Sequence, residues 1–161
     1  MSTIYVGIGE WAASSVPQTK IRTLGLGSCI GIVAYCQSAH IGGLLHIALP
    51  DSQINPQRAS AKPGVFADTG IPLFLKDLQQ LGINTTQKLV IKLVGGATIM
   101  DEKQVFNIGK RNLLAVKKIL WANQLGALVE EVGGQFSRSV ELEIATGRTL
   151  INSPGRGTWE I

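Results

Sequence analysis

Two short apolar runs in the first third of the chain constrain the fold most. Residues Ile30–Tyr35 and Ile41–Leu49 are rich in β-branched and leucine side chains, and only residues 36–40 separate them. Runs of this length, bounded by turn residues, favour two strands joined by a turn rather than a helix. We therefore expect the two runs to pair as neighbours in a buried sheet.

The remaining pattern predicts more strands and two helices. One helix is expected from Asp68, acting as its N-cap, to about Leu81, and another from Asn107 to about Gln124. Short apolar or alternating segments predict further strands at Ile4–Gly9, Lys20–Leu24, Leu89–Val94, Leu128–Val132, Val140–Ala145 and Arg148–Ile151. This order of elements predicts an α+β layered sandwich rather than repeated βαβ units.

Two segments lack such periodicity. Residues 51–64 are polar and contain two prolines, which predicts a long exposed loop. Residues 153–161 contain Pro154 and two glycines, which predicts a loosely held tail. The length of 161 residues is typical of one domain, so residues 1–161 are expected to form a single domain.

Composition excludes several classes of protein. Hydrophobic residues make up 45% of the chain and charged residues 16%, which excludes intrinsic disorder. The net charge of +4 is scattered without a long basic run, so no nucleic-acid partner is expected. There is no secretory leader pattern and no apolar run of about 18 residues, so we expect a cytoplasmic protein without membrane insertion.

Cys29 is the first candidate for chemistry. It follows Gly25, Gly27 and Ser28 at the end of a predicted strand. Small residues would let a substrate reach the sulfur, and main-chain N–H groups of this turn could stabilise an oxyanion. Most free cysteines are instead small buried hydrophobes, and residue type alone leaves that alternative open.

His46 is the second candidate, because pairing of the two apolar runs would bring it beside Cys29. A Cys–His pair can form a thiolate near neutral pH and also supplies a base. The alternative is a core histidine bonded to a backbone carbonyl. Thr23 could orient the imidazole, although a threonine in a strand is usually explained by β-propensity.

Metal and cofactor sites are poorly supported. The spacing of Cys29, Cys36, His40 and His46 matches no zinc-finger pattern. The glycines around Cys29 do not have the dinucleotide-binding spacing, and a strand rather than a helix is expected to follow them. We therefore expect no metal and no cofactor.

Several segments, taken in order, resemble the CheD family of chemoreceptor glutamine deamidases. They span nearly the whole chain: Val6–Glu10, Thr23–Cys29, Leu45–Ser52, Lys62–Thr69, Lys92–Ala97 and Asn107–Asn112. The chain departs from the family pattern at Ser137, where the family usually has glycine, and at Glu131, where aspartate is common. These departures concern local strand geometry.

The resemblance implies that Cys29 is the nucleophile, His46 the base and Thr23 the third catalytic member, with Gly27 and Ser28 in the oxyanion turn. It implies hydrolysis of receptor glutamine side chains to glutamate, with release of ammonia through a Cys29 thioester. Hydrolysis of glutamyl methyl esters would share that intermediate. The implied fold is an α/β/α sandwich around mixed β-sheets.

The implied partners are the cytoplasmic region of methyl-accepting chemoreceptors and, in some members, a CheC-type phosphatase. An alternative function is an adaptor of the chemotaxis system that acts mainly by binding the phosphatase or the receptor. A thiol hydrolase of small amides is a further alternative. If His46 pairs with Cys29, the thiolate–imidazolium form should already be populated near neutral pH.

Overall fold

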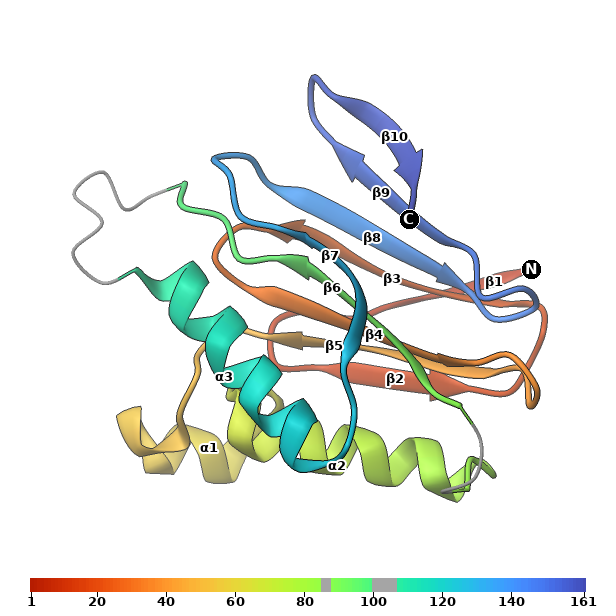
Figure 1. Cartoon of the computed structure of the whole chain (residues 1–161), viewed down its shortest axis with the longest axis horizontal. Coiled ribbons are helices and arrows are strands. Elements are labelled where there is room, and N and C mark those ends of the chain that lie inside the picture. The colour runs from red at the N-terminus through yellow and green to blue at the C-terminus, as the bar shows by residue number, and fades with distance from the viewer. Residues whose placement is uncertain (85–87, 100–106) are drawn as a thin grey trace.

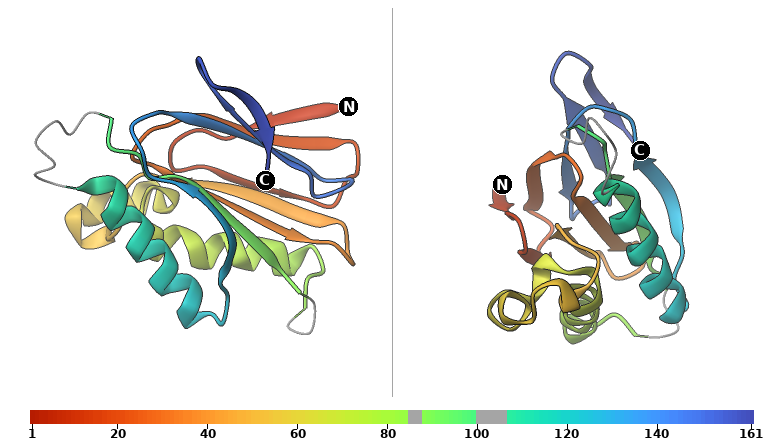
Figure 2. Two further views of the ribbon diagram at one scale, coloured as in Figure 1. Left: turned by 45° about the horizontal axis from the view of Figure 1, so that its top comes forward. Right: turned by 90° about the vertical axis from the view of Figure 1, so that its left-hand side faces the viewer.

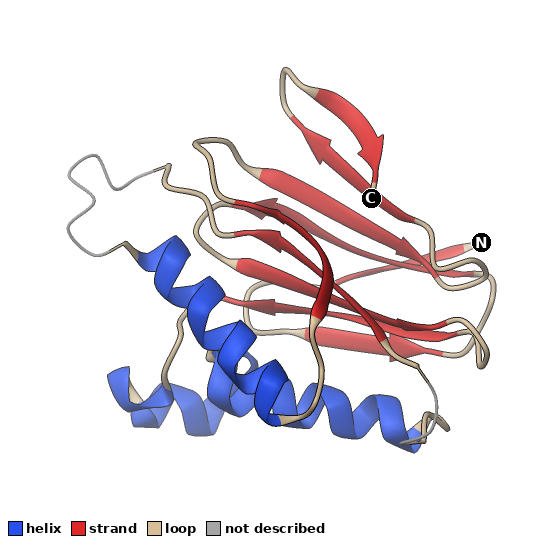
Figure 3. Cartoon of the chain, in the orientation of Figure 1, coloured by secondary structure: helices blue, strands red, loops and turns tan. Residues whose placement is uncertain are grey.

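The structure is a computed structural model that describes residues 1–84, 88–99 and 107–161. Within these ranges the chain forms ten β-strands, three α-helices and two short 3-10 helices (Figure 1). The strands make two five-stranded sheets, and the helices gather on one side of them (Figure 3). None of the helices in the described ranges is long and apolar enough to cross a membrane.

The first sheet has the order β1-β3-β8-β9-β10. Its strands are β1 (Ser2–Tyr5), β3 (Thr19–Leu26), β8 (Arg138–Glu143), β9 (Thr149–Ser153) and β10 (Gly157–Glu160). β1 pairs with β3 in parallel, and the other neighbours are antiparallel. The views in Figure 2 agree that β9 and β10 extend away from α1 and α2.

The second sheet has the order β2-β5-β4-β6-β7. Its strands are β2 (Trp11–Ser14), β4 (Ile30–Cys36), β5 (Ile41–Ile47), β6 (Val90–Gly95) and β7 (Ala127–Val132). Only β6 and β7 are parallel in it. The predicted pairing of the two apolar runs is confirmed, because β4 and β5 are antiparallel neighbours and all their residues are buried.

The three helices are α1 (Pro56–Ala61), α2 (Ala67–Gln80) and α3 (Ile108–Ala122). Of these, α2 and α3 cover the second sheet on the face away from the first sheet, and α1 packs beside residues 63–66. Successive residues of β4 serve two cores: Ile32 packs toward the helices, and Val33 packs toward the first sheet. The α+β class with mixed sheets is therefore confirmed. The layers follow in the order helices, second sheet, first sheet. The α/β/α sandwich implied by the resemblance would instead have helices on both sides of the sheets.

Some local expectations need correction. The exposed loop predicted over residues 51–64 contains α1, flanked by two 3-10 helices, η1 (Ser52–Ile54) and η2 (Pro63–Val65). The Asn55 side chain caps α1 at the N–H of Arg58, and Pro56 begins the helix, a start signal that apolar periodicity overlooks.

Two further boundaries differ from the prediction. Asp68 does not cap α2; it lies in the first turn, where its carboxylate accepts hydrogen bonds from the backbone and hydroxyl of Ser52. Asn107 lies at the predicted N-cap position of α3, but its side chain makes no capping hydrogen bond within the described residues of that helix. Where a loosely held tail was expected over residues 153–161, the structure forms β10, which pairs with β9.

Candidate active site

The candidate site lies where the chain passes from the first sheet to the second. β3 belongs to the first sheet and β4 to the second, and residues 27–29 connect them. The register of β3 shifts between Thr23 and Leu26, and Gly25 adopts a positive φ of 64° there. This irregularity re-aims the end of β3, as β-bulges near functional sites commonly do.

Strand alternation brings Thr23 and His46 together between the two sheets. In β3, Thr23 shares its inward face with Ile21, and in β5, His46 shares its face with Leu44. Thr23 is 1% exposed and His46 is 3% exposed. The two side chains therefore meet across the sandwich, away from water.

The hydrogen bonds of Thr23 determine the tautomer of His46. Thr23 Oγ1 lies 2.7 Å from His46 Nδ1 and 2.6 Å from the carbonyl oxygen of Val6. A carbonyl can only accept, so the single hydroxyl proton of Thr23 goes to Val6. His46 Nδ1 must then donate its proton to Thr23, and the lone pair of neutral His46 lies on Nε2.

That Nε2 atom is buried and has no hydrogen-bond partner among the described residues. The only other buried side-chain atom in this condition there is Oδ1 of Asn112, which lies in the same region of the molecule. Native proteins keep few such atoms, and each calls for a functional or structural explanation. An unprotonated imidazole nitrogen without a partner is poised to accept a proton.

The register of the hairpin places Cys29 on the same side as His46. His46 is opposite Gly31, and Cys29 precedes Gly31 by two residues, so both side chains point to one face. Cys29 lies just before β4 and packs against the core between the two sheets, which also holds Leu44 from the His46 face of β5. Cys29 is partly buried, and no hydrogen bond joins its sulfur to His46 Nε2 in the described structure.

Burial keeps both groups neutral in the resting site. It lowers the pKa of His46 to about 4, with the nearby Glu10 carboxylate opposing the shift. It raises the pKa of the Cys29 thiol, with the backbone N–H of Cys29 opposing that shift. Removal of water penalises both charged forms, so the resting pair differs from the thiolate–imidazolium form expected near neutral pH.

Each of the three carbonyl groups of residues 27–29 accepts a hydrogen bond. The N–H of Ala97 binds the Gly27 carbonyl at 2.8 Å, and the N–H of Gly96 binds the Cys29 carbonyl at 2.8 Å. Asn112 Nδ2 binds the Ser28 carbonyl at 2.9 Å. In a trans peptide, N–H and C=O point in opposite directions. The N–H of Ser28 therefore points away from Ala97 and the N–H of Cys29 away from Asn112, which makes them candidates for oxyanion donors.

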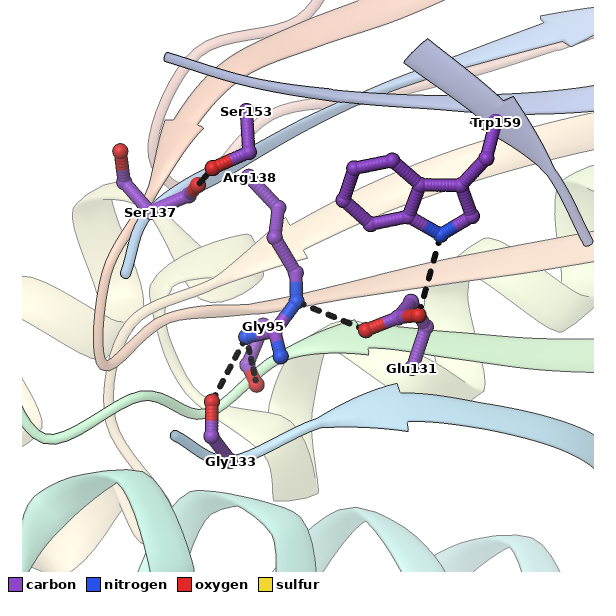
Figure 4. Close-up of polar contacts among 7 residues, drawn as sticks. All are labelled: Gly95, Glu131, Gly133, Ser137, Arg138, Ser153 and Trp159. Carbon is purple, nitrogen blue, oxygen red and sulfur yellow. Dashed lines mark hydrogen bonds and ion pairs between the residues drawn. The ribbon is translucent and has the colours of Figure 1, made fainter. Parts of the chain in front are cut away.

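Gly95 and the buried Arg138 support the segment that binds the Cys29 turn. Gly95 has a positive φ of 113°, and a Cβ atom there would lie 2.2 Å from the Cys29 carbonyl oxygen. Arg138 is 2% exposed and donates to the carbonyls of Gly133 and Gly95 and to the carboxylate of Glu131 (Figure 4). Glu131, one of the departures from the family pattern, forms an ion pair with Arg138 at a nitrogen–oxygen distance of 3.0 Å.

Sequence reasoning did not identify Asn112 or Arg138 as site residues. A signal for Asn112 exists, because it is a polar residue on the face of α3 that also carries the buried Val116 and Leu120. Its two partner carbonyls lie 84 and 64 residues away along the chain, however, and no local pattern indicates them.

The other sequence candidates lie elsewhere. Cys36 and His40 flank the turn at the opposite end of the β4–β5 hairpin from Cys29. Cys36 is buried with its sulfur 3.4 Å from the Ser38 hydroxyl, and His40 is exposed. Across residues 1–84, 88–99 and 107–161, no three His, Cys, Asp or Glu side chains gather as metal ligands.

The fold and the buried Thr–His pair beside a cysteine place the chain among proteins with a candidate thiol-dependent site. The family model described as "CheD chemotactic sensory transduction" matches residues 48–153. The chain belongs to the CheD family.

Full-length relatives extend this similarity over the segment that holds Thr23, Cys29 and His46. The "Probable chemoreceptor glutamine deamidase CheD" of Syntrophotalea carbinolica is 44% identical over 100% of both chains. That of Solibacter usitatus is 44% identical over 97% of this chain and 92% of the relative. The "Chemoreceptor glutamine deamidase CheD" of Thermotoga maritima is 39% identical over 94% of this chain and 92% of the relative.

Proposed function

We propose that this protein is a cysteine-dependent deamidase that converts glutamine side chains of chemoreceptors to glutamate. The observation that carries the proposal is the hydrogen bond from His46 Nδ1 to Thr23, which leaves a buried, unprotonated Nε2 on the face that also bears Cys29. The names of the curated relatives supply the substrate class.

The first half of the reaction forms a thioester. Cys29 Sγ bonds to the carboxamide carbon, and the thiol proton passes to His46 Nε2. The carbonyl oxygen becomes an oxyanion that accepts hydrogen bonds from the N–H groups of Ser28 and Cys29. The developing negative charge favours the imidazolium, which offsets the effect of burial on His46. His46 then gives its proton to the nitrogen, the C–N bond breaks, and ammonia leaves.

The second half regenerates the enzyme. His46 Nε2 takes a proton from water, whose oxygen bonds to the thioester carbon. The C–S bond breaks, and the Cys29 sulfur recovers a proton from His46 as the glutamate side chain is released. A glutamyl methyl ester would enter the same route with methanol as the leaving group, so methyl ester hydrolysis is part of the proposal.

The proposed place of action is the cytoplasm, where the signalling region of a chemoreceptor would present its glutamines. The family resemblance extends the proposal to a CheC-type phosphatase as a binding partner. Copurification of the two purified proteins by size-exclusion chromatography would test that contact independently of catalysis.

Mass spectrometry of a receptor cytoplasmic fragment tests the reaction directly. Incubation with the protein should produce, at defined glutamines, the mass increase caused by exchange of NH2 for OH, together with equimolar ammonia. Cys29→Ala should abolish both signals, because the covalent nucleophile is lost. Cys36→Ala is the matched control and should retain turnover. Equal loss in both variants, or full turnover by Cys29→Ala, would exclude the mechanism.

A further inference from the structure

We propose that Asn112 of α3 is a positioning residue. It orients the N–H of Cys29 and joins residues 27–29, which carry the proposed nucleophile, to the end of β5, which carries His46. The proposal rests on the proposed function, because it concerns the oxyanion formed in that reaction. It depends on three features of the structure: the partners of the Asn112 amide, the place where those partners lie, and the way α3 is held.

Both protons of the Asn112 amide have hydrogen-bond acceptors. Its Nδ2 atom lies 2.9 Å from the Ser28 carbonyl oxygen and 2.9 Å from the Ala48 carbonyl oxygen. Both partners can only accept hydrogen bonds, so both amide protons are used and the orientation of the side chain follows. Asn112 is 0% exposed, so neither bond competes with water.

These two carbonyls lie where the β4–β5 pairing ends. The regular register stops at the pair Ile30 and Ile47. Beyond that pair the two strands separate, and the Asn112 amide binds one carbonyl from each of them. A single side chain therefore spans the gap between the chain that carries Cys29 and the chain that carries His46.

The bond to Ser28 has a direct consequence for Cys29. The Ser28 carbonyl and the Cys29 N–H belong to one planar peptide unit and point in opposite directions. Anchoring the oxygen on Asn112 therefore aims the Cys29 N–H in the opposite direction, away from the Asn112 amide. Asn112 thus sets the direction of a proposed oxyanion donor without touching the substrate.

Backbone packing holds α3 at the required distance. A Cβ atom at Gly109 would lie 2.6 Å from the Gly96 carbonyl oxygen and 2.7 Å from that of Ala97. Gly96 and Ala97 are the residues whose N–H groups hold the Cys29 turn. Asn112 follows Gly109 by three residues and so lies on the same face of the helix. The first turn of α3 is therefore in contact with the segment that supports the turn.

Asn112→Leu tests the proposal, because leucine has a similar size and no donor. With a receptor fragment as substrate, we expect kcat to fall about a hundredfold with little change in KM, since the oxyanion donor is misdirected. We also expect the pH midpoint for iodoacetamide labelling of Cys29 to rise, because its N–H no longer stabilises the thiolate.

Two variants on the same helix separate positioning from stability. Val116→Ala removes buried volume one turn further along and should lower Tm while leaving kcat within about twofold at a temperature where the protein is folded. Asn123→Leu, at the C-cap of α3, removes an exposed amide that donates to the Ile119 carbonyl and should leave kcat and the labelling midpoint unchanged. If Asn112→Leu loses no more kcat than Val116→Ala, and the labelling midpoint is unchanged, Asn112 is only structural.

Asn112→Asp keeps the test decisive if the leucine variant does not fold. The carboxylate would repel both carbonyls, whereas the protonated acid would restore one donor. The kcat of this variant relative to the wild type should therefore rise as the pH is lowered from 8 toward 5. A constant ratio would overturn the proposal. If the wild-type protein itself released no ammonia, the proposed function would fail, whereas the labelling midpoints would still decide the role of Asn112.

Discussion

The two histidines of this protein have similar hydrogen bonds at opposite ends of one hairpin. His40 Nδ1 lies 3.2 Å from the Tyr35 hydroxyl, which donates to the Ile144 carbonyl at 2.7 Å. His46 Nδ1 lies 2.7 Å from Thr23, which donates to the Val6 carbonyl at 2.6 Å. In both cases the hydroxyl donates a hydrogen bond to a carbonyl and faces the Nδ1 atom of the imidazole as an acceptor.

The surroundings distinguish them. His40 is exposed in a turn, and its Nδ1 is also 3.1 Å from the Ala145 carbonyl, so its contacts tie two hairpins together. His46 is buried between the sheets, with a partnerless Nε2 and a cysteine on the same face. The hydrogen bonds alone therefore do not distinguish the two histidines; His46 is the candidate base because its Nε2 is buried without a partner among the described residues and Cys29 lies on the same face.

The largest expected effect follows from this difference. His46→Gln should lower kcat for glutamine deamidation by about a thousandfold or more, because it removes the only proposed acid and base. His40→Gln should leave kcat nearly unchanged. Ammonia release from a receptor fragment measures both. Comparable losses in the two variants would show that the contrast between the two histidines has no catalytic meaning.

The next effect concerns stability in acid. The pKa of His46 is about 4 in the folded protein and about 6.5 when unfolded, so the unfolded chain binds the extra proton first. Stability is therefore lost as the pH falls from 6.5 to 4, by about 3 kcal/mol in total. His46→Gln should lack this component.

Urea unfolding at about pH 7 and pH 4.5 would measure the stability difference between wild type and variant. On acidification, the wild type should lose about 2–3 kcal/mol more of its free energy of unfolding than His46→Gln does. A stability difference that stays constant over this range would mean that His46 titrates alike in both states.

A smaller loss of activity is expected from the partner hydroxyls. Thr23→Val keeps the shape of the side chain but frees the imidazole to adopt the other tautomer, so kcat should fall about 10–100-fold, as for other groups that orient a functional histidine. Tyr35→Phe removes the matching hydroxyl at His40 and should cost stability only. If Thr23→Val retained full turnover, the tautomer argument would be wrong.

The sequence was sufficient for the part of the site that depends on local pairing. Two apolar runs with one short turn allow few registers, so the antiparallel pairing that places His46 opposite Gly31 was predictable from the sequence. α3 was predictable for a similar reason, since its N-cap position and apolar spacing are local.

Features that depend on distant contacts were not predictable. β2 is short and weakly patterned, and it lies at an edge, where Trp11 Nε1 donates to the Asp77 carboxylate at 2.7 Å. The layer order depends on which sheet the helices cover, and no single segment encodes that choice. The neutral resting state of Cys29 and His46 also arises from burial, which follows only from the packed structure.

The smallest expected effect is on the titration of the resting thiol. An ordinary thiol has a pKa of about 8.5. Burial raises the pKa of Cys29, so its labelling by iodoacetamide should have a midpoint above that value. Because neutral His46 contributes no charge near Cys29 at rest, neither His46→Gln nor His40→Gln should move this midpoint by more than about half a pH unit.

A denatured control would first establish that both thiols react, because Cys36 is buried in the native protein. A midpoint near neutral pH that rises in His46→Gln would mean that the ion pair already exists at rest. With no such rise, the two histidines are alike toward the resting thiol. His46 would then differ from His40 only during the reaction, when the Cys29 sulfur attacks the substrate carbonyl and the thiol proton passes to Nε2.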